Sequence, residues 1–311
     1  MKARLTLAFV GLAALLVLAF LLAPVDFRQV LGYAANNPFG MVLALLAYTG
    51  AFVLRAFSWR RLLWERVPLR GLFALIMGAL FLNHIAPAKA GDIARMYALA
   101  KRGVAGERAV ASVVLGRLVD LVGLLVVLTA SLAFAGGAGR WETVGYAALV
   151  VLGMIVALLV LSRLNLFARF GLVGRQVDRL RGALRDTTPS ALLRSLAFAT
   201  PAWVLEAGIL SYVGRGLGLE LSPAQVLAAT CFAILVSAVP LAPSALGTYE
   251  AGMVAILVLF GVPADLAFAA AVSTHAIKFL YALAAAPFAL REGLAAIRKG
   301  EKKPDEARVE V

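Results

Sequence analysis

The residues of this chain that could do chemistry are charged side chains placed inside long apolar runs. Arg117 and Asp120 lie three residues apart in one run, and His275 and Lys278 lie three apart in another. Residues at that spacing share one face of a helix. Glu206 lies in the middle of a third run. Because a charge at membrane depth costs roughly 2.5–3.5 kcal/mol or more, each of these side chains needs a partner or a role.

Two proline-containing polar breaks interrupt other apolar runs and resemble each other. The first reads Ala-Pro-x-x-x-Gly-Asp over 86–92, and the second reads Ala-Pro-x-x-x-Gly-Thr over 242–248. A helix that restarts in such a break, at Asp92 or at Thr248 or Tyr249, directs free N–H groups and a positive dipole end into it. Helix starts of this kind attract anions. A plain N-cap role is the alternative for Asp92 and Thr248.

These features predict a cavity that favours a phosphate-like headgroup. We expect Lys278, Arg117 and Arg95 to hold the phosphate, because cationic donors form the strongest hydrogen bonds to it. The carboxylates of Glu250, Asp92 and Glu206 would balance charge or bind an amine or a proton. The candidate substrate-binding residues are Asn83, Pro87, Lys89, Asp92, Arg95, Arg117, Asp120, Glu206, Pro243, Ser244, Gly247, Glu250, His275 and Lys278.

A structural role for the same charges is the alternative. Arg117 would then pair with Asp120, and Lys278 would pair with Glu206 or Glu250, which would only lock helices together. His275 and Lys278 have no acidic neighbour at helical spacing, so this pair favours a functional role.

The elements that must position these residues are membrane-spanning helices. Apolar residues make up 62% of the chain, against roughly 45–50% in soluble domains. Continuous apolar runs predict six spans, at 5–23, 39–54, 109–135, 143–161, 196–213 and 266–290. Four of them are near or a little under the ~20 residues that a spanning helix needs, and 109–135 and 266–290 are longer. Alternating barrel strands do not fit runs of this kind.

Two further apolar stretches are too short to cross and predict re-entrant hairpins. One covers 71–82 and is followed by the first break; the other covers 226–239, breaks, and resumes over 249–262. Basic residues flank both sides of the first stretch, so its two ends lie on the same side under the positive-inside rule. The alternative is that proline and glycine merely kink two ordinary spans.

Repeated order and charge predict an inverted-topology repeat. Span, hairpin and span recur over 39–135 and 191–290, and the basic loops place the second copy upside down. Interrupted helices in inverted repeats indicate a transport site near the bilayer midplane. We therefore expect one transmembrane domain over 1–290 and a charged cytoplasmic tail over 291–311. Both termini are predicted to be cytoplasmic, in a multi-pass protein of the plasma (inner) membrane.

Several function classes lose support. The net charge of +13 comes from basic blocks beside the apolar runs, which indicates topology and anionic lipid contact instead of nucleic acid. Metalloprotease, nucleotide-binding and hydrolase motifs are missing from the sequence. Two histidines and one cysteine, Cys231, give no metal cluster and no disulfide. We expect no cofactor and no enzyme activity.

The motifs resemble those of the transmembrane, flippase-like domain of lysylphosphatidylglycerol synthases, over about residues 5–290. They are Asn83-x-x-x-Pro87-x-x-x-Gly91-Asp92-x-x-Arg95, Gly116-Arg117-x-x-Asp120 and Pro240-x-x-Pro243-x-x-x-Gly247-x-x-Glu250. The family usually has glutamate at the positions of Asp92 and Gly116, and two glycines at those of Ser244 and Ala245. The resemblance implies lipid translocation. Two-domain members add a soluble aminoacyltransferase domain, and after residue 290 we expect only the tail and no synthesis of lysyl-lipid.

The predicted function is a lipid translocase that moves a phosphate-bearing lipid between leaflets. Its partners would be a membrane phospholipid or a polyprenyl-phosphate lipid, with a homo-oligomer or a lipid-modifying enzyme as further partners. The alternative is a membrane subunit of polyprenyl-phosphate-linked glycan synthesis or lipid modification. A structural scaffold is a third class.

Overall fold

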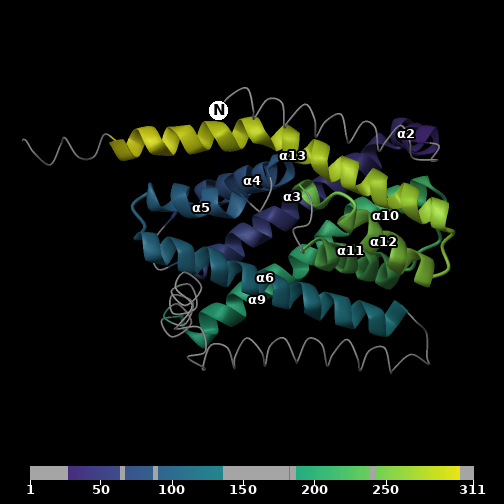
Figure 1. Ribbon diagram of the computed structural model, residues 1–311, viewed down its shortest axis with the longest axis horizontal. Coiled ribbons are helices and arrows are strands. Elements are labelled where there is room, and N and C mark those ends of the chain that lie inside the picture. Colours follow the sequence, from purple (N-terminus) through teal and green to yellow (C-terminus); the bar gives the residue numbers. More distant parts are fainter. Residues whose placement is uncertain are drawn as a thin grey trace, which may run out of the picture.

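The computed structural model describes residues 27–63, 67–86, 90–135, 182, 187–238 and 243–301. In these ranges the regular elements are all helical, which confirms the predicted all-α class there (Figure 1). The α-helices are α2 (Phe27–Asn36), α3 (Pro38–Arg60), α4 (Leu69–Ile85), α5 (Ala90–Ala100), α6 (Gly106–Ala135), α9 (Pro189–Glu206), α10 (Gly208–Gly216), α11 (Pro223–Ser237), α12 (Thr248–Leu259) and α13 (Ala264–Glu301). A short 3-10 turn, η2, covers Pro243–Ala245.

Four helical segments of the described chain are long and apolar enough to cross a membrane. They are Pro38–Arg60, Gly106–Ala135, the nearly continuous pair α9–α10 at Pro189–Gly216, and Ala264–Glu292 of α13. Each corresponds to one of the six predicted spans. The other two predicted spans, 5–23 and 143–161, lie outside the described residues.

The shorter apolar helices form two packed pairs. α4 packs along α5, and α11 packs along α12. In Figure 1 the first pair occupies one half of the bundle and the second pair the other half, with α3 and α13 passing between or beside them. The turn from α5 to α6 and the turn from α12 to α13 consequently lie at opposite ends of the bundle.

The first break is shorter than the sequence predicts. The apolar pattern placed its start at Asn83, whereas α4 continues through Asn83 and His84 to Ile85. Both polar side chains find partners without leaving the helix, because His84 Nδ1 hydrogen-bonds the carbonyl of Leu80 and Asn83 Oδ1 accepts from the Gly91 N–H. The predicted site residues Pro87 and Lys89 lie outside the described residues.

Gly91 brings α5 unusually close to α4. Its N–H donates to Asn83 Oδ1 at 2.9 Å, and a Cβ at this position would overlap the carbonyl oxygen of Ala79. Gly252 on α12 is similarly close to Ala233 and Val236 on α11. Small residues at helix contacts allow backbones to approach in this way. Steric fit therefore holds both pairs together.

The second break has an uncommon backbone. Ser244, Ala245 and Gly247 have φ values of 59°, 57° and 81°. This left-handed region suits glycine and costs other residues roughly 1–2 kcal/mol each. The N-cap of α12 is Gly247, and Thr248 is already helical, with its hydroxyl donating to the Ala245 carbonyl. The N-cap role considered for Thr248 is therefore wrong, because this hydroxyl donates backwards instead of accepting from the first turn.

Close packing at Gly91 gives a stability prediction. We expect Gly91→Ala to lower the melting temperature in detergent, because forcing a methyl group into a packed contact costs about 1–3 kcal/mol. Gly106→Ala, at a position where a Cβ meets nothing within 4 Å, is the matched control. Equal melting temperatures for the two variants would contradict the close approach of α5 to α4.

Candidate functional site

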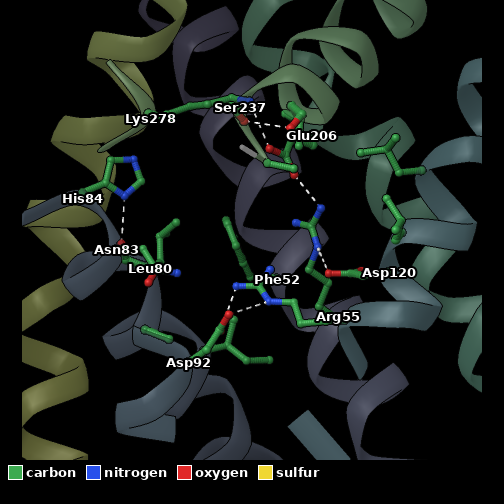
Figure 2. A pocket seen from close by; sticks show the side chains of 18 of the residues that line it. Phe52, Arg55, Leu80, Asn83, His84, Asp92, Asp120, Glu206, Ser237 and Lys278 are labelled. Carbon is green, nitrogen blue, oxygen red and sulfur yellow. Dashed lines mark hydrogen bonds and ion pairs between the residues drawn. The ribbon is translucent and has the colours of Figure 1, made fainter. Parts of the chain in front are cut away.

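A cavity of about 470 Å³ lies among the helices where the two packed pairs approach each other. Side chains from α3, α4, α5, α6, α9, α11, α12 and α13 line it, together with η2 (Figure 2). The ionisable residues in its lining are Arg55, His84, Asp92, Arg95, Arg117, Asp120, Glu206, Tyr48, Tyr249, His275 and Lys278. A charged hollow inside an apolar helical protein is therefore the candidate site.

A chain of ion pairs crosses the deep part of the cavity. Lys278 Nζ lies 3.0 Å from Glu206 Oε1, and Glu206 Oε2 lies 2.6 Å from Arg55 Nη2. Arg55 Nε is 3.4 Å from Asp120 Oδ2. These four residues come from α13, α9, α3 and α6, and their two positive and two negative charges cancel. We call them the buried ion-pair chain.

Aromatic rings surround the cations of this chain. The guanidinium of Arg55 lies 4.2 Å from the Trp203 ring centroid, and Lys278 Nζ lies 5.6 Å and 5.3 Å from the rings of Tyr48 and Tyr249. Trp203 also donates through Nε1 to the carbonyl of Asp120 at 2.9 Å. The ring faces add cation–π attraction and replace water around the charges.

A second cluster in the cavity lining places two arginines on one carboxylate. Arg117 donates from Nε and Nη2 to Asp92 at 3.0 and 2.8 Å, and Arg95 Nη2 donates to the same carboxylate at 2.7 Å. The Arg95 Nε is buried and has no hydrogen-bond partner. The Arg117 side chain is 48% exposed, against 12% for Arg95. This Asp92 cluster has one positive charge in excess and an unused donor.

A third group connects the second break to α13. Glu250 accepts from the Gly247 N–H at 2.7 Å through Oε2 and pairs with His275 Nδ1 at 2.5 Å through Oε1. The His275 Nε2 is 3.5 Å from the Ser244 hydroxyl. The His275 side chain is 9% exposed and lines the cavity, whereas Glu250 is not part of the lining.

The structure brings most of the predicted site residues together. Those in the cavity lining are Asn83, Asp92, Arg95, Arg117, Asp120, Glu206, Ser244, His275 and Lys278. The remaining described ones belong to the second break. Gly247 is bonded to Glu250, which contacts His275, and Pro243 begins the turn that carries Ser244. In the described part of the chain, no cluster of three His, Cys, Asp or Glu residues forms a potential metal site.

The partners of these charges differ from the simplest sequence expectation. Arg117 pairs with Asp92, 25 positions away, instead of with Asp120 on its own helix. Of the two carboxylates considered for Lys278, Glu206 is the partner. Asp92 lies in the first turn of α5 and accepts from arginines. The partner of each charge depends on which helices pack together. The spacing of residues along one helix does not show this.

Sequence reasoning missed Arg55. Arg55 directly follows the predicted span at 39–54, as a basic flanking residue outside the membrane would. In the structure α3 continues to Arg60, and Arg55 is 9% exposed. A signal was present, because that run is shorter than the ~20 residues a spanning helix needs. Extending the helix to full length would have put Arg55 inside it.

Comparisons with known proteins agree with the family that the motifs resemble. Residues 5–286 match the family described as "Lysylphosphatidylglycerol synthase TM region", which confirms the resemblance drawn from the sequence. A relative in Methanocaldococcus jannaschii, "UPF0104 membrane protein MJ1078", is 26% identical over 213 residues, covering 64% of this chain and 88% of the relative. No solved structure matches the chain.

The buried ion-pair chain gives a second stability prediction. We expect Glu206→Gln to destabilise the protein by about 3–5 kcal/mol, because it leaves the buried Lys278 without a charged partner and Arg55 with Asp120 alone. The control is Glu292→Gln, which breaks the pair with Arg70, a side chain that is 72% exposed. Such surface pairs contribute about 0–1 kcal/mol. Thermal unfolding in detergent compares the two variants, and similar losses would show that the Glu206 pairs stabilise no more than surface pairs.

Proposed function

Because this chain belongs to the lysylphosphatidylglycerol synthase TM-region family, a family of membrane proteins, we propose that it is a lipid translocase. In this proposal a phosphate-bearing lipid moves between leaflets with its headgroup in the charged cavity and its acyl chains in the bilayer. The observation that carries the proposal is the cavity itself, a charged hollow of headgroup size in an apolar helical frame.

The charge balance of the cavity favours an anion. Its lining holds four cationic side chains, Arg55, Arg95, Arg117 and Lys278, against the three carboxylates Asp92, Asp120 and Glu206. The excess positive charge is in the Asp92 cluster, since the buried ion-pair chain is neutral. A phosphate oxygen can accept a hydrogen bond from the unused Arg95 Nε–H and another from the guanidinium of Arg117. The planar guanidinium group suits paired hydrogen bonds to oxyanions.

An opening for the headgroup is expected beside α5. Arg117, the most exposed member of the Asp92 cluster, is in contact with that helix through Asp92. α5 also presents Ile93 and Tyr97, which are 66% and 62% exposed. Exposed apolar side chains of a membrane helix suit acyl chains. A headgroup can then enter at Arg117 while its tails remain against α5.

We further propose the arrangement of six spans and two re-entrant hairpins in an inverted repeat. Four spans have candidates among the described helices, and the packed pairs α4–α5 and α11–α12 are short enough to be the hairpins. Their positions in opposite halves of the bundle (Figure 1) support entry from opposite faces. Both termini would lie on the cytoplasmic side. Because the sequence has no nucleotide-binding motif, a gradient of lipid, protons or ions would drive transport.

Lipid translocation is testable with the purified protein in vesicles that contain fluorescent phosphatidylglycerol. We expect the protein to move this probe between leaflets, and Arg117→Gln to slow it by about tenfold or more, because a lost charge-assisted hydrogen bond costs about 1.5–3 kcal/mol. Arg60→Gln, at an exposed end of α3, is the control and keeps the rate. Intact transport in Arg117→Gln would remove the Asp92 cluster from the path.

The inverted repeat is tested separately by cysteine accessibility. In a Cys231→Ala background, Lys101→Cys should react from the cytoplasmic side and Asp265→Cys from the opposite side. Both positions are exposed, and they lie in or beside the two turns at opposite ends of the bundle. Labelling of both cysteines from one side would exclude the inverted arrangement while leaving the transport assay unaffected.

A further inference from the structure

His275 lies between the second break and the end of α4. It comes from α13, pairs with Glu250 at the start of α12, and approaches Ser244 in η2. Its ring centroid is 6.2 Å from that of His84, in the last turn of α4. α4 itself packs against η2. One imidazole therefore contacts the second break and faces the end of the helix that precedes the first.

The hydrogen bonds of His275 suit two protonation states. In the neutral ring, Nδ1–H donates to the Glu250 carboxylate and Nε2 is an acceptor that faces Ser244. In the protonated ring both nitrogens donate, and the contact with Glu250 becomes an ion pair. Imidazole is the side chain whose ordinary titration lies near neutral pH. Glu250 stays held by the Gly247 N–H in either state.

The groups around His275 make it a better proton site than its neighbour. Facing it are His84 on α4, Tyr249 and Glu250 on α12, Lys278 on α13 and, through Lys278, Glu206 on α9. His84 hydrogen-bonds a backbone carbonyl and not a carboxylate. Lys278 is already paired with Glu206. Among the described cavity residues, His275 is thus the histidine with its own carboxylate.

We propose that His275 and Glu250 form a proton-binding site, and that the proton crosses the membrane together with the anionic headgroup. This inference rests on the proposed lipid translocation. A proton on His275 adds one positive charge to the cavity wall and offsets the negative charge of the headgroup in a low-dielectric space. Linkage makes the effect reciprocal, so the anion raises the affinity for the proton by the factor by which the proton raises the affinity for the anion.

Proton binding also changes the second break. Protonation converts the His275 Nε2 from an acceptor to a donor toward Ser244, a residue held at a φ of 59°. Residues held in such a backbone conformation depend on their surroundings to stay there. Protonation of His275 would thus favour anion binding in the cavity and also change the contact between α13 and η2. Through this contact, ligand binding would be coupled to the conformation of the second break.

The test uses vesicles that contain the protein and fluorescent phosphatidylglycerol, with a pH difference of one unit and the membrane potential clamped by potassium and valinomycin. Cotransport of one proton per lipid predicts about a tenfold enrichment of the probe in the leaflet that faces the alkaline side, since one pH unit is a factor of ten in proton activity. His275→Gln keeps a donor toward Glu250 but binds no proton, and should give equal leaflets. Arg60→Gln, at an exposed end of α3 and outside the cavity lining, should keep the enrichment.

The outcomes separate this inference from the proposed function. Translocation with equal leaflets in the unmodified protein overturns proton coupling and leaves the translocase proposal standing, whereas no movement of the probe at any pH counts against the translocase. Enrichment that persists in His275→Gln, or that favours the acidic side, also overturns the inference. If His275→Gln moves no lipid, proton uptake is measured in weakly buffered detergent on adding dihexanoylphosphatidylglycerol. About one proton per unmodified protein and none for the variant supports the site, and equal uptake removes it.

Discussion

The buried ion-pair chain from Lys278 through Glu206 and Arg55 to Asp120 determines how the long helices stand around the cavity. Each of its members comes from a different helix, and each side chain is at most 18% exposed. Separating two of these helices would strand a charge in a medium that solvates it poorly. The frame made by α3, α6, α9 and α13 is therefore held by interactions that are costly to open.

The short helices are attached to this frame in a different way. α4 meets α5, and α11 meets α12, through glycines and small apolar side chains. Two of their polar connections to the frame are the pairs Asp92–Arg117 and Glu250–His275, near the cavity. Another lies at the surface, where Arg70 of α4 pairs with Glu292 of α13. Steric contacts between helices can form again after a small shift of one helix, whereas moving a buried charge away from its partner leaves that charge unpaired. The protein thus combines a frame held by buried ion pairs with two packed helix pairs. The Asp92–Arg117 connection between them lines the cavity, where a ligand would contact it.

Sequence alone predicted the parts of this structure that depend on local composition. The lengths of the apolar runs predicted the helices, and the prolines predicted the breaks. The costly charges and the polar residues of the breaks together predicted nine residues of the cavity lining. It named Glu206 as one of two possible partners of Lys278, which the structure confirms. It did not predict the other ion pairs of the cavity, because their partners are far apart in the chain, as with Arg55 and Glu206 at a separation of 151. Arg55 was also missed because a basic residue at the end of a short apolar run is interpreted as lying outside the membrane under the positive-inside rule.

The backbone of the second break has a consequence for the mechanics of the protein. Ser244 and Ala245 stand where the family pattern has two glycines, yet both keep the left-handed conformation that glycine adopts freely. A glycine pair would work there as a loose joint with many accessible angles. Side chains at both positions remove most of those angles, so the left-handed conformation of Ser244 and Ala245 depends on the tertiary contacts around them. Ser244 and Ala245 therefore leave the second break fewer accessible backbone conformations than a glycine pair would allow at the same positions.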